Sequence, residues 1–462
     1  MRTLPLLLAL ACAAPEPKSA DSGTPPGEPA LVCDRSVDLL AAPPPIDTEV
    51  GRIAAIDLLT VDADAIVGDD GTVTLSTTLT FLVGEADGRV VFELGPDPES
   101  VTLDGDPATL DSVSVSEPVR ELRVLDAELD RCSAHTLVVR TTLPVGWLDD
   151  GGQARLERYP EGTWWSSGQE DDRPARYLGM WFPTNLLFDR FTLALDLHVP
   201  PGHQLASTGD VSTTDDGFRV TWPRPVQSHG PLWVLSPTAL THSLTRTVEL
   251  TDGPVSIEIH AFAPDDLGEA ATRATDALTA FDATYTPYLH GDRYVVWLRE
   301  DRNSSMEYDG GTVTRLSALE HEIHHSWFAR GAAPVADLHG WVDEAITSWA
   351  TDLLPYRAFE IDFDTDPLLL RIGAGPWAGA TLSTETYILG GSLFSGLAAV
   401  HGVDVVTDAL GAFAAARSDR PYRDEELEAH LDCWLDDPLV HRAFVHIAYG
   451  GVDDGAPSDP CP

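Results

Sequence analysis

The chain has 462 residues, a length that allows two or three domains with a large buried core. It carries 74 acidic and 29 basic residues, which gives a formal net charge of −45. A field of that sign repels nucleic acid and anionic lipid head groups, so we expect neither as a direct partner.

The N-terminus has the pattern of an export signal. One positive charge precedes the short apolar run Leu4–Ala11, which is too short to span a bilayer as a helix. Residues 1–12 resemble a bacterial lipoprotein signal, because a small residue lies directly before Cys12. Residues 13–46 are rich in proline, alanine, serine and acids, which predicts a disordered tether. We expect an exported bacterial protein, lipid-anchored at the cell envelope and touching the membrane only there. The alternative is plain secretion after cleavage near Ala14.

Besides Cys12, the chain holds Cys33, Cys132, Cys433 and Cys461. An even number of cysteines in an exported chain indicates two disulfide bonds, for which three pairings are possible. We favour Cys33–Cys132 and Cys433–Cys461, since each would tie a terminal segment to its neighbouring domain.

Residues 47–250 form the first predicted domain. Apolar and polar residues alternate along Thr72–Phe81 and again along Phe191–Val199, which is the period of a half-buried strand. Several such segments joined by Asp-Gly turns predict an N-terminal antiparallel β-sandwich or saddle. The same pattern would equally suit a plain adhesion-type module.

Residues 251–462 form the second predicted domain, of the α+β class. A strand is expected at Val255–His260, a helix at Asp266–Leu289 and a strand at Tyr294–Leu298, which leads to a loop with Met306 and Glu307. Further helices are expected at Leu393–His401, Asp404–Ala415 and Glu425–Leu435, as a short C-terminal helical part.

A metal motif lies between these segments. His321, Glu322 and His325 spell H-E-x-x-H, and Glu344 follows after eighteen intervening residues. Histidines four positions apart on a helix lie near one face, so both imidazoles can reach one cation. Two nitrogens and one carboxylate leave a fourth tetrahedral position open, as in catalytic zinc sites. We therefore predict one Zn²⁺ per chain, with Glu322 placed to take a proton from the activated water.

The sequence of this helix also allows other interpretations. The motif could be a polar helix face with satisfied histidines, since Leu319 and Ile323 would suit that equally well. A second helical run, Ala345–Leu354, favours the metal because it lets Glu344 return against the first helix. His324 also lies on a nearby face, and we expect it to point outward or to support the ligands from behind.

Two stretches give the chain a family resemblance. His321–Trp327 with Trp341–Glu344 resembles H-E-x-x-H-x-W and W-x-x-E, and Ser304–Tyr308 is similar to G-x-M-E-N. These are segments of the gluzincin aminopeptidases, of the alanyl aminopeptidase and leukotriene hydrolase type. The resemblance implies that Glu307 holds the free α-amine of a peptide, with Met306 beside it in the substrate site. It also implies a thermolysin-like catalytic domain.

Two further stretches extend the resemblance. Tyr387–Gly390 is similar to the family's Y-x-x-G, whose tyrosine hydrogen-bonds the oxyanion. Gln169, Asp171 and Arg176 match a Q-x-(acid)-x4-R pattern, in which the glutamine and the acid approach the amino end of the substrate. The match runs from about residue 47 to 450, and we expect the large C-terminal helical domain of many members to be absent.

The chain departs from the family at a few positions. Ser304 and Ser305 replace a glycine-containing pair, and Tyr308 replaces the usual asparagine. Ala345 follows the last metal ligand where the family usually has glycine, and Tyr356 is a rival for the role of the oxyanion tyrosine.

The expected function is a zinc-dependent aminopeptidase that acts on peptide substrates. Two alternatives stay open: a metallo-endopeptidase of broader specificity, and a non-catalytic lipoprotein binding module on a peptidase scaffold. Substrate preference and oligomeric state are not specified by any pattern in the sequence.

Overall fold

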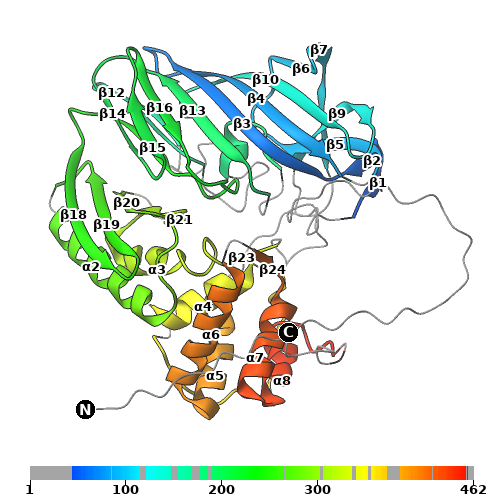
Figure 1. Ribbon diagram of the computed structural model, residues 1–462, viewed down its shortest axis with the longest axis vertical. Helices are drawn as coiled ribbons and strands as arrows, with labels where there is room; N and C mark the ends of the chain where they lie inside the picture. Colours follow the sequence, from blue (N-terminus) through cyan, green and yellow to red (C-terminus); the bar gives the residue numbers. More distant parts are fainter. Residues whose placement is uncertain are drawn as a thin grey trace, which may run out of the picture.

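The chain folds into β-sheets at one end and a mixed sheet with helices at the other (Figure 1). The computed structural model describes residues 44–84, 86–114, 121–146, 155–168, 177–185, 189–264, 266–301, 305–335, 340–351, 355–371, 386–418, 420–453 and 455. Cys33 and Cys461 lie outside these residues, so the disulfide pairing stays a prediction.

A long sheet dominates the N-terminal part, in the strand order β15-β16-β13-β3-β4-β10-β6-β7. Its central strands, β3 (Ile56–Val67) and β4 (Val73–Val83), alternate between buried and more exposed residues, as the sequence predicted for this region. The strand expected at Phe191–Val199 is confirmed as β13 (Thr192–His198). β13 pairs with β3 in parallel, whereas the neighbouring pairs are antiparallel. The other strands are β6 (Ser100–Leu103), β7 (Asp106–Ala108), β10 (Ala134–Leu143), β15 (Asp210–Thr213) and β16 (Gly217–Thr221).

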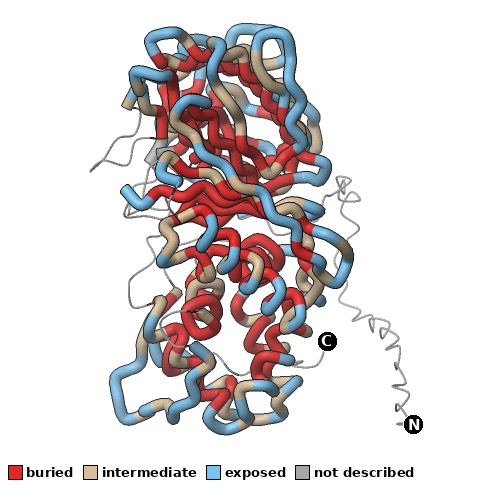
Figure 2. Tube along the Cα trace, turned by 90° about the vertical axis from the view of Figure 1, so that its left-hand side faces the viewer, coloured by how far each residue is buried: buried red, intermediate tan, exposed pale blue. Residues whose placement is uncertain are grey.

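Two smaller sheets complete this part, in the orders β1-β2-β5-β9-β8 and β11-β12-β17-β14. Between the sheets, the ring of Trp165 meets those of Trp181 and Trp233 edge to face, each at 5.6 Å. Buried stretches run through the sheets and continue to where the strands meet the helices (Figure 2). The strands are β1 (Ile46–Thr48), β2 (Gly51–Ala54), β5 (Gly88–Glu93), β8 (Leu110–Ser114), β9 (Glu121–Leu129), β11 (Leu156–Tyr159), β12 (Gly162–Ser166), β14 (His203–Ser207) and β17 (Trp233–Pro237), and η1 (Tyr177–Met180) is a 3₁₀ turn.

The C-terminal part begins with a mixed sheet of order β18-β19-β20-β22-β21. β18 (His242–Leu250) pairs with β19 (Gly253–Ala261). This sheet therefore includes a strand from before residue 251, where the second domain was predicted to begin. β20 (Arg293–Leu298) lies where a strand was expected. Met306 and Glu307 were expected in a loop, which was wrong. They lie in β21 (Met306–Tyr308), which pairs antiparallel with β22 (Gly311–Thr314) across an Asp-Gly turn.

The helix that packs on β18 and β19 is α2 (Leu267–Thr284), which ends before the expected Leu289. Pro287 explains the difference, because a proline cannot continue a helix and restricts the residue before it. The remaining helices are η2 (Leu316–Ala318), α3 (Leu319–His324), α4 (Trp341–Ala350), η4 (Thr386–Gly390), α5 (Gly391–His401), α6 (Val403–Arg417), α7 (Asp424–Leu435) and α8 (Leu439–Ile447), and β23 (Ala333–Pro334) pairs with β24 (Pro421–Tyr422). Of these helices, α8 was not predicted.

One core cluster joins the two parts of the molecule. Trp164 from β12 and Val234 from β17 pack with Trp297 from β20 and Met306 from β21. Across the same junction, the Tyr308 hydroxyl donates a hydrogen bond to the Gly168 carbonyl at 3.1 Å. The β-sheets therefore hold β21 in place beside the zinc motif.

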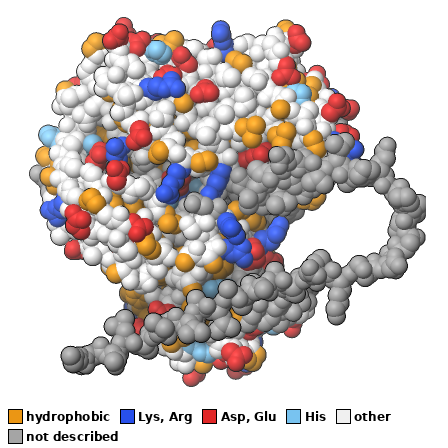
Figure 3. Space-filling view, in the orientation of Figure 1, with side chains coloured by type: hydrophobic (Ala, Val, Ile, Leu, Met, Phe, Trp, Pro, Cys, Tyr) orange, Lys and Arg blue, Asp and Glu red, His pale blue; other side chains and the backbone are white. Residues whose placement is uncertain are grey.

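Acidic side chains are scattered over the face of the molecule in Figure 3, in keeping with the large negative charge. Within the described residues, no helix is both long and apolar enough to cross a membrane.

Candidate metal centre

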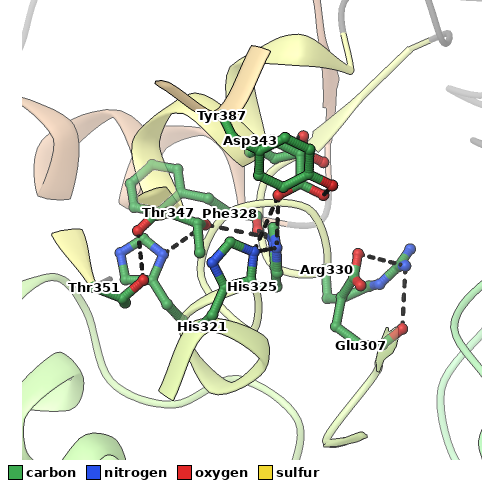
Figure 4. A network of polar contacts seen from close by, with 11 residues as sticks. Glu307, His321, His325, Phe328, Arg330, Asp343, Thr347, Thr351 and Tyr387 are labelled. Carbon is green, nitrogen blue, oxygen red and sulfur yellow. Dashed lines mark hydrogen bonds and ion pairs between the residues drawn. The ribbon is translucent and has the colours of Figure 1, made fainter. Parts of the chain in front are cut away.

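Two histidines and one glutamate converge on a single point. The short helix α3 buries Leu319 and Ile323 in the core, which leaves its other face to His321 and His325. Their Nε2 atoms lie 3.2 Å apart. Oε2 of Glu344, from α4, lies 3.1 Å from Nε2 of His321 and 3.5 Å from Nε2 of His325. The ligand atoms of all three lie within 4.8 Å of one another, so the fold brings the three predicted ligands together. Figure 4 shows His321 and His325 among their polar contacts.

The hydrogen bonds of His325 prepare it to bind a metal. Its Nδ1 lies 3.0 Å from the carbonyl oxygen of Phe328. A carbonyl can only accept, so Nδ1 carries a proton, and Nε2, which faces Glu344, is the nitrogen left to bind a metal. Two imidazole nitrogens with one carboxylate form the donor set that Zn²⁺ takes in catalytic sites. The residues present therefore fit zinc.

His324 stands behind the ligands. It is fully buried, with Nδ1 2.8 Å from the Thr347 hydroxyl and Nε2 3.1 Å from the Tyr285 hydroxyl. Burial, with the neighbouring His325 and His321, lowers its pKa well below the ordinary value. The expected outward position is wrong, because the ring is fully buried. The Thr347 hydroxyl that it contacts also lies 3.4 Å from Nδ1 of His325, which places His324 behind that ligand.

The charges around Glu344 favour an ionised ligand. Burial alone would raise its pKa, but the charge of His325 and hydrogen bonds from both histidines hold that pKa below the ordinary value. Next to it, burial and the Glu344 carboxylate raise the pKa of Asp343 to about 7. Asp343 Oδ1 accepts the backbone N–H of Glu344 at 2.7 Å. This contact was not predicted, since it depends on the local turn at the start of α4.

The first residue of helix α4, Trp341, is hydrogen-bonded to a buried ion pair. The indole N–H of Trp341 donates to Asp424 Oδ2 at 2.9 Å, and Arg371 contacts both oxygens of the same carboxylate at 2.8 and 2.6 Å. Asp424 is fully buried. The start of the helix that carries Glu344 is thus tied to α7.

Glu322, the predicted base, is also buried beside the ligands, with 5% of its surface exposed. It lies in α3, three residues before His325, and its carboxylate is close enough to Glu307 on β21 to influence the pKa of Glu307. A carboxylate in this position can exchange a proton with a group bound between the ligands and β21.

Tyr387 reaches the site from the π-helical turn η4. Its hydroxyl donates to Oε1 of Glu344 at 2.9 Å, and its ring stacks on His321 with centroids 6.1 Å apart. The rival, Tyr356, lies elsewhere: its hydroxyl is 3.2 Å from that of Tyr285, behind His324.

The turn η4 packs tightly against α4. A Cβ added to Gly390 would lie 2.7 Å from Cβ of Ala345, closer than real Cβ atoms approach other atoms. Ala345, where the related family usually has glycine, therefore packs against a glycine, Gly390, on the facing element.

Glu307 lies beside the metal ligands, but it has a partner that the sequence did not predict. Arg330, in the turn after α3, donates from Nη2 to Oε1 of Glu307 at 2.9 Å and to the Glu307 carbonyl at 3.2 Å (Figure 4). Burial acts to raise the pKa of Glu307, His325 acts to lower it, and Glu322 and Glu344 act to raise it. The guanidinium of Arg330 favours the charged carboxylate, so the contact is an ion pair.

The remaining predicted substrate residues divide into two groups. Met306 is buried in the cluster that joins the two parts of the chain, directly before Glu307. Gln169, Asp171 and Arg176 lie outside the described residues, so their approach to the substrate stays a prediction.

The fold of the chain is similar to that of several solved structures. An M1 zinc metallopeptidase from Deinococcus radiodurans aligns with 88% of this chain and 96% of its own, at a TM-score of 0.64 and 16% identity. A complex of that type with a Tyr-Ser-Ala substrate, also from D. radiodurans, covers 88% of this chain and 97% of its own at a TM-score of 0.61 and 17% identity. Yeast LTA4 hydrolase matches 88% of this chain and 69% of its own at a TM-score of 0.62 and 13% identity.

The chain has the fold of the M1 zinc metallopeptidases. The M1 fold spans both the β-sheets and the part that holds the metal motif, because 88% of the chain is aligned. No family model matches the sequence, and no curated protein is detectably similar to it.

Proposed function

We propose that this protein is a zinc-dependent metallopeptidase that removes residues from the N-terminus of peptides. The observation that carries the proposal is the convergence of His321, His325 and Glu344, whose ligand atoms lie within 4.8 Å of one another. The M1 fold of the chain supports it.

The chemistry divides among the named residues. A zinc ion held by the three ligands would act as a Lewis acid on the scissile carbonyl and make a water molecule a stronger nucleophile. Glu322 accepts a proton from the attacking water on its carboxylate and passes it to the leaving amine. The Tyr387 hydroxyl turns from Glu344 to the oxyanion that develops on the carbonyl oxygen when water attacks the carbonyl carbon, a contact worth about 10²–10³ in rate.

Peptides are the substrates we favour. Solved M1 neighbours are complexes with a Tyr-Ser-Ala substrate and with L-tryptophan, which supports a peptide or amino-acid ligand here too. Glu307 lies next to the ligands, where a carboxylate can pair with an α-ammonium and set the first peptide bond against the metal.

A metallo-endopeptidase is the second candidate, and the contact between Glu307 and Arg330 favours it. A carboxylate already paired with a guanidinium at 2.9 Å offers less to an α-ammonium. A site that does not depend on the amine would accept bonds inside a chain.

The test uses the purified mature chain, with metal content measured by elemental analysis. A panel of aminoacyl amides and N-acetylated peptides is then assayed with and without a zinc chelator. We expect about one zinc per chain, hydrolysis that stops on chelation, and recovery when zinc is added back. Zinc-free protein, or zinc-loaded protein that cuts no member of the panel, would instead favour the binding-module interpretation.

We also propose that the protein is held at the cell envelope through a lipid on Cys12, as its signal pattern suggests. Mass spectrometry of the mature N-terminus tests this. A mature chain that starts beyond Cys12 would favour secretion.

A further inference from the structure

The side chains of Arg330 and Glu307 form a buried ion pair at the predicted amine subsite. Only 3% of the Arg330 side chain and 11% of the Glu307 side chain are exposed. Nη2 of Arg330 contacts both the carboxylate and the backbone carbonyl of Glu307. Charge-assisted bonds of this kind, out of bulk water, are among the stronger contacts in proteins.

Backbone hydrogen bonds shape the turn that carries Arg330, and contacts to Glu307 hold its guanidinium. Ala329 has a φ of 105°, a strained value for a residue with a Cβ. The Arg330 N–H bonds the His325 carbonyl at 3.0 Å, and Ala332 closes the turn onto Trp327 at 3.0 Å. The backbone of Arg330 is thus hydrogen-bonded directly to His325, one of the three predicted metal ligands.

The guanidinium has a second partner on the other part of the molecule. Its Cζ lies 5.8 Å from the ring centroid of Tyr177, in the 3₁₀ turn η1. An α-ammonium that approaches Glu307 must therefore share the carboxylate with a cation held from two sides. Like charges close together in a desolvated pocket repel each other, which weakens binding of the ammonium.

We propose that Arg330 is a specificity-determining residue: it occupies on Glu307 the place that a substrate α-ammonium would take, and so lets the site accept peptides whose N-terminus is blocked. This inference rests on the proposed peptidase function. It assigns a substrate class, N-blocked peptides and internal peptide bonds, alongside peptides with a free amine.

The experiment compares kcat/KM for a peptide amide with that for its N-acetylated twin. We expect the wild-type ratio of free to acetylated substrate to stay below about tenfold. Arg330→Gln removes the competing cation, and we expect it to raise this ratio at least about tenfold. Arg330→Lys keeps a charge without the planar fork and should fall between the two. The double variant Arg330→Gln with Glu307→Gln should return the ratio to near the wild-type value.

Arg299→Gln is the matched control. Arg299 is another buried guanidinium, paired with Asp301 at 2.8 and 2.9 Å, and its loss should leave the ratio unchanged. Zinc content and the melting temperature are measured for every variant.

Three outcomes would overturn the inference. The first is a folded, zinc-loaded Arg330→Gln enzyme with the wild-type ratio. The second is a wild-type ratio of free to acetylated substrate above about a hundredfold. This measurement does not need the variant, so it tests the inference even if Arg330→Gln does not fold. The third is a rise in the ratio that persists in the double variant. Wild-type protein that loads zinc but cuts neither twin would count against the proposed function itself, which keeps the two failures distinct.

Discussion

The hydroxyl of Tyr387 donates to Oε1 of Glu344 at 2.9 Å, while Oε2 of the same carboxylate faces His321 at 3.1 Å. One ligand carboxylate is thus held between the metal-binding histidines and the expected oxyanion donor. In the absence of substrate, the tyrosine orients the ligand. With substrate bound, it must exchange that partner for the oxyanion.

This exchange predicts the effect of Tyr387→Phe. The variant should keep its zinc and lose about 10²–10³ in kcat with little change in KM, because the donor acts mainly in the transition state. Steady-state kinetics and metal analysis check it. Loss of zinc would mean instead that Tyr387 mainly holds the ligand.

Glu322→Gln separates the base from the ligands. The amide cannot take the proton of the attacking water, so we expect kcat to fall by at least about 10²-fold while about one zinc per chain remains. Full activity in this variant would remove Glu322 from the mechanism.

His325→Ala should lose the metal itself, and so should Glu344→Ala, because each removes one of three protein ligands. The matched control is His324→Ala. His324 is the adjacent, equally buried histidine, whose ring nitrogens face hydroxyl groups. It should keep zinc and show only a lower melting temperature. Loss of zinc from His324→Ala alone would contradict the ligand set.

Glu307→Ala tests the amine subsite from the other side. Removal of the carboxylate leaves the buried Arg330 guanidinium without its counter-charge. Because Arg330 already occupies this carboxylate in the wild type, we expect kcat/KM to fall by similar factors for free-amine and acetylated peptides. A loss about tenfold larger for free-amine peptides would show that the α-ammonium, and not Arg330, is the main partner of Glu307.

Asp424→Asn tests the anchor of α4. The carboxylate is fully buried and pairs with Arg371 and the Trp341 indole. Loss of its charge should destabilise the fold by about 3 kcal/mol, measured by urea unfolding. Asp408→Asn, at an exposed position of α6, should change the unfolding free energy by less than about 0.5 kcal/mol. Similar effects of both variants would argue against the anchor.

The metal ligands could be predicted from sequence because a helix converts spacing directly into position. His321 and His325 share a face through the helical period, and Glu344 follows on the next helix. The alternating strands β4 and β13 were predictable for the same reason. The early end of α2 was also predictable, since Pro287 lies in the expected helix.

Arg330 could not be predicted in this way. Its contact with Glu307 joins residues 23 positions apart, from a strand and a turn that only the tertiary fold brings together. The Arg371–Asp424 pair, 53 positions apart, is of the same kind. No local period encodes such contacts, and the strand β21 became visible only through its pairing with β22.

The close approach of Gly390 to Ala345 has a consequence for evolution at this site. The two positions can exchange volume only together: a side chain on one demands its absence on the other, since their Cβ atoms would lie 2.7 Å apart. Glu344 precedes Ala345, and Tyr387 lies three residues before Gly390. A methyl group added at Gly390 would therefore push apart the two elements that carry the ligand and the oxyanion donor, so only one of them can carry a side chain at this contact.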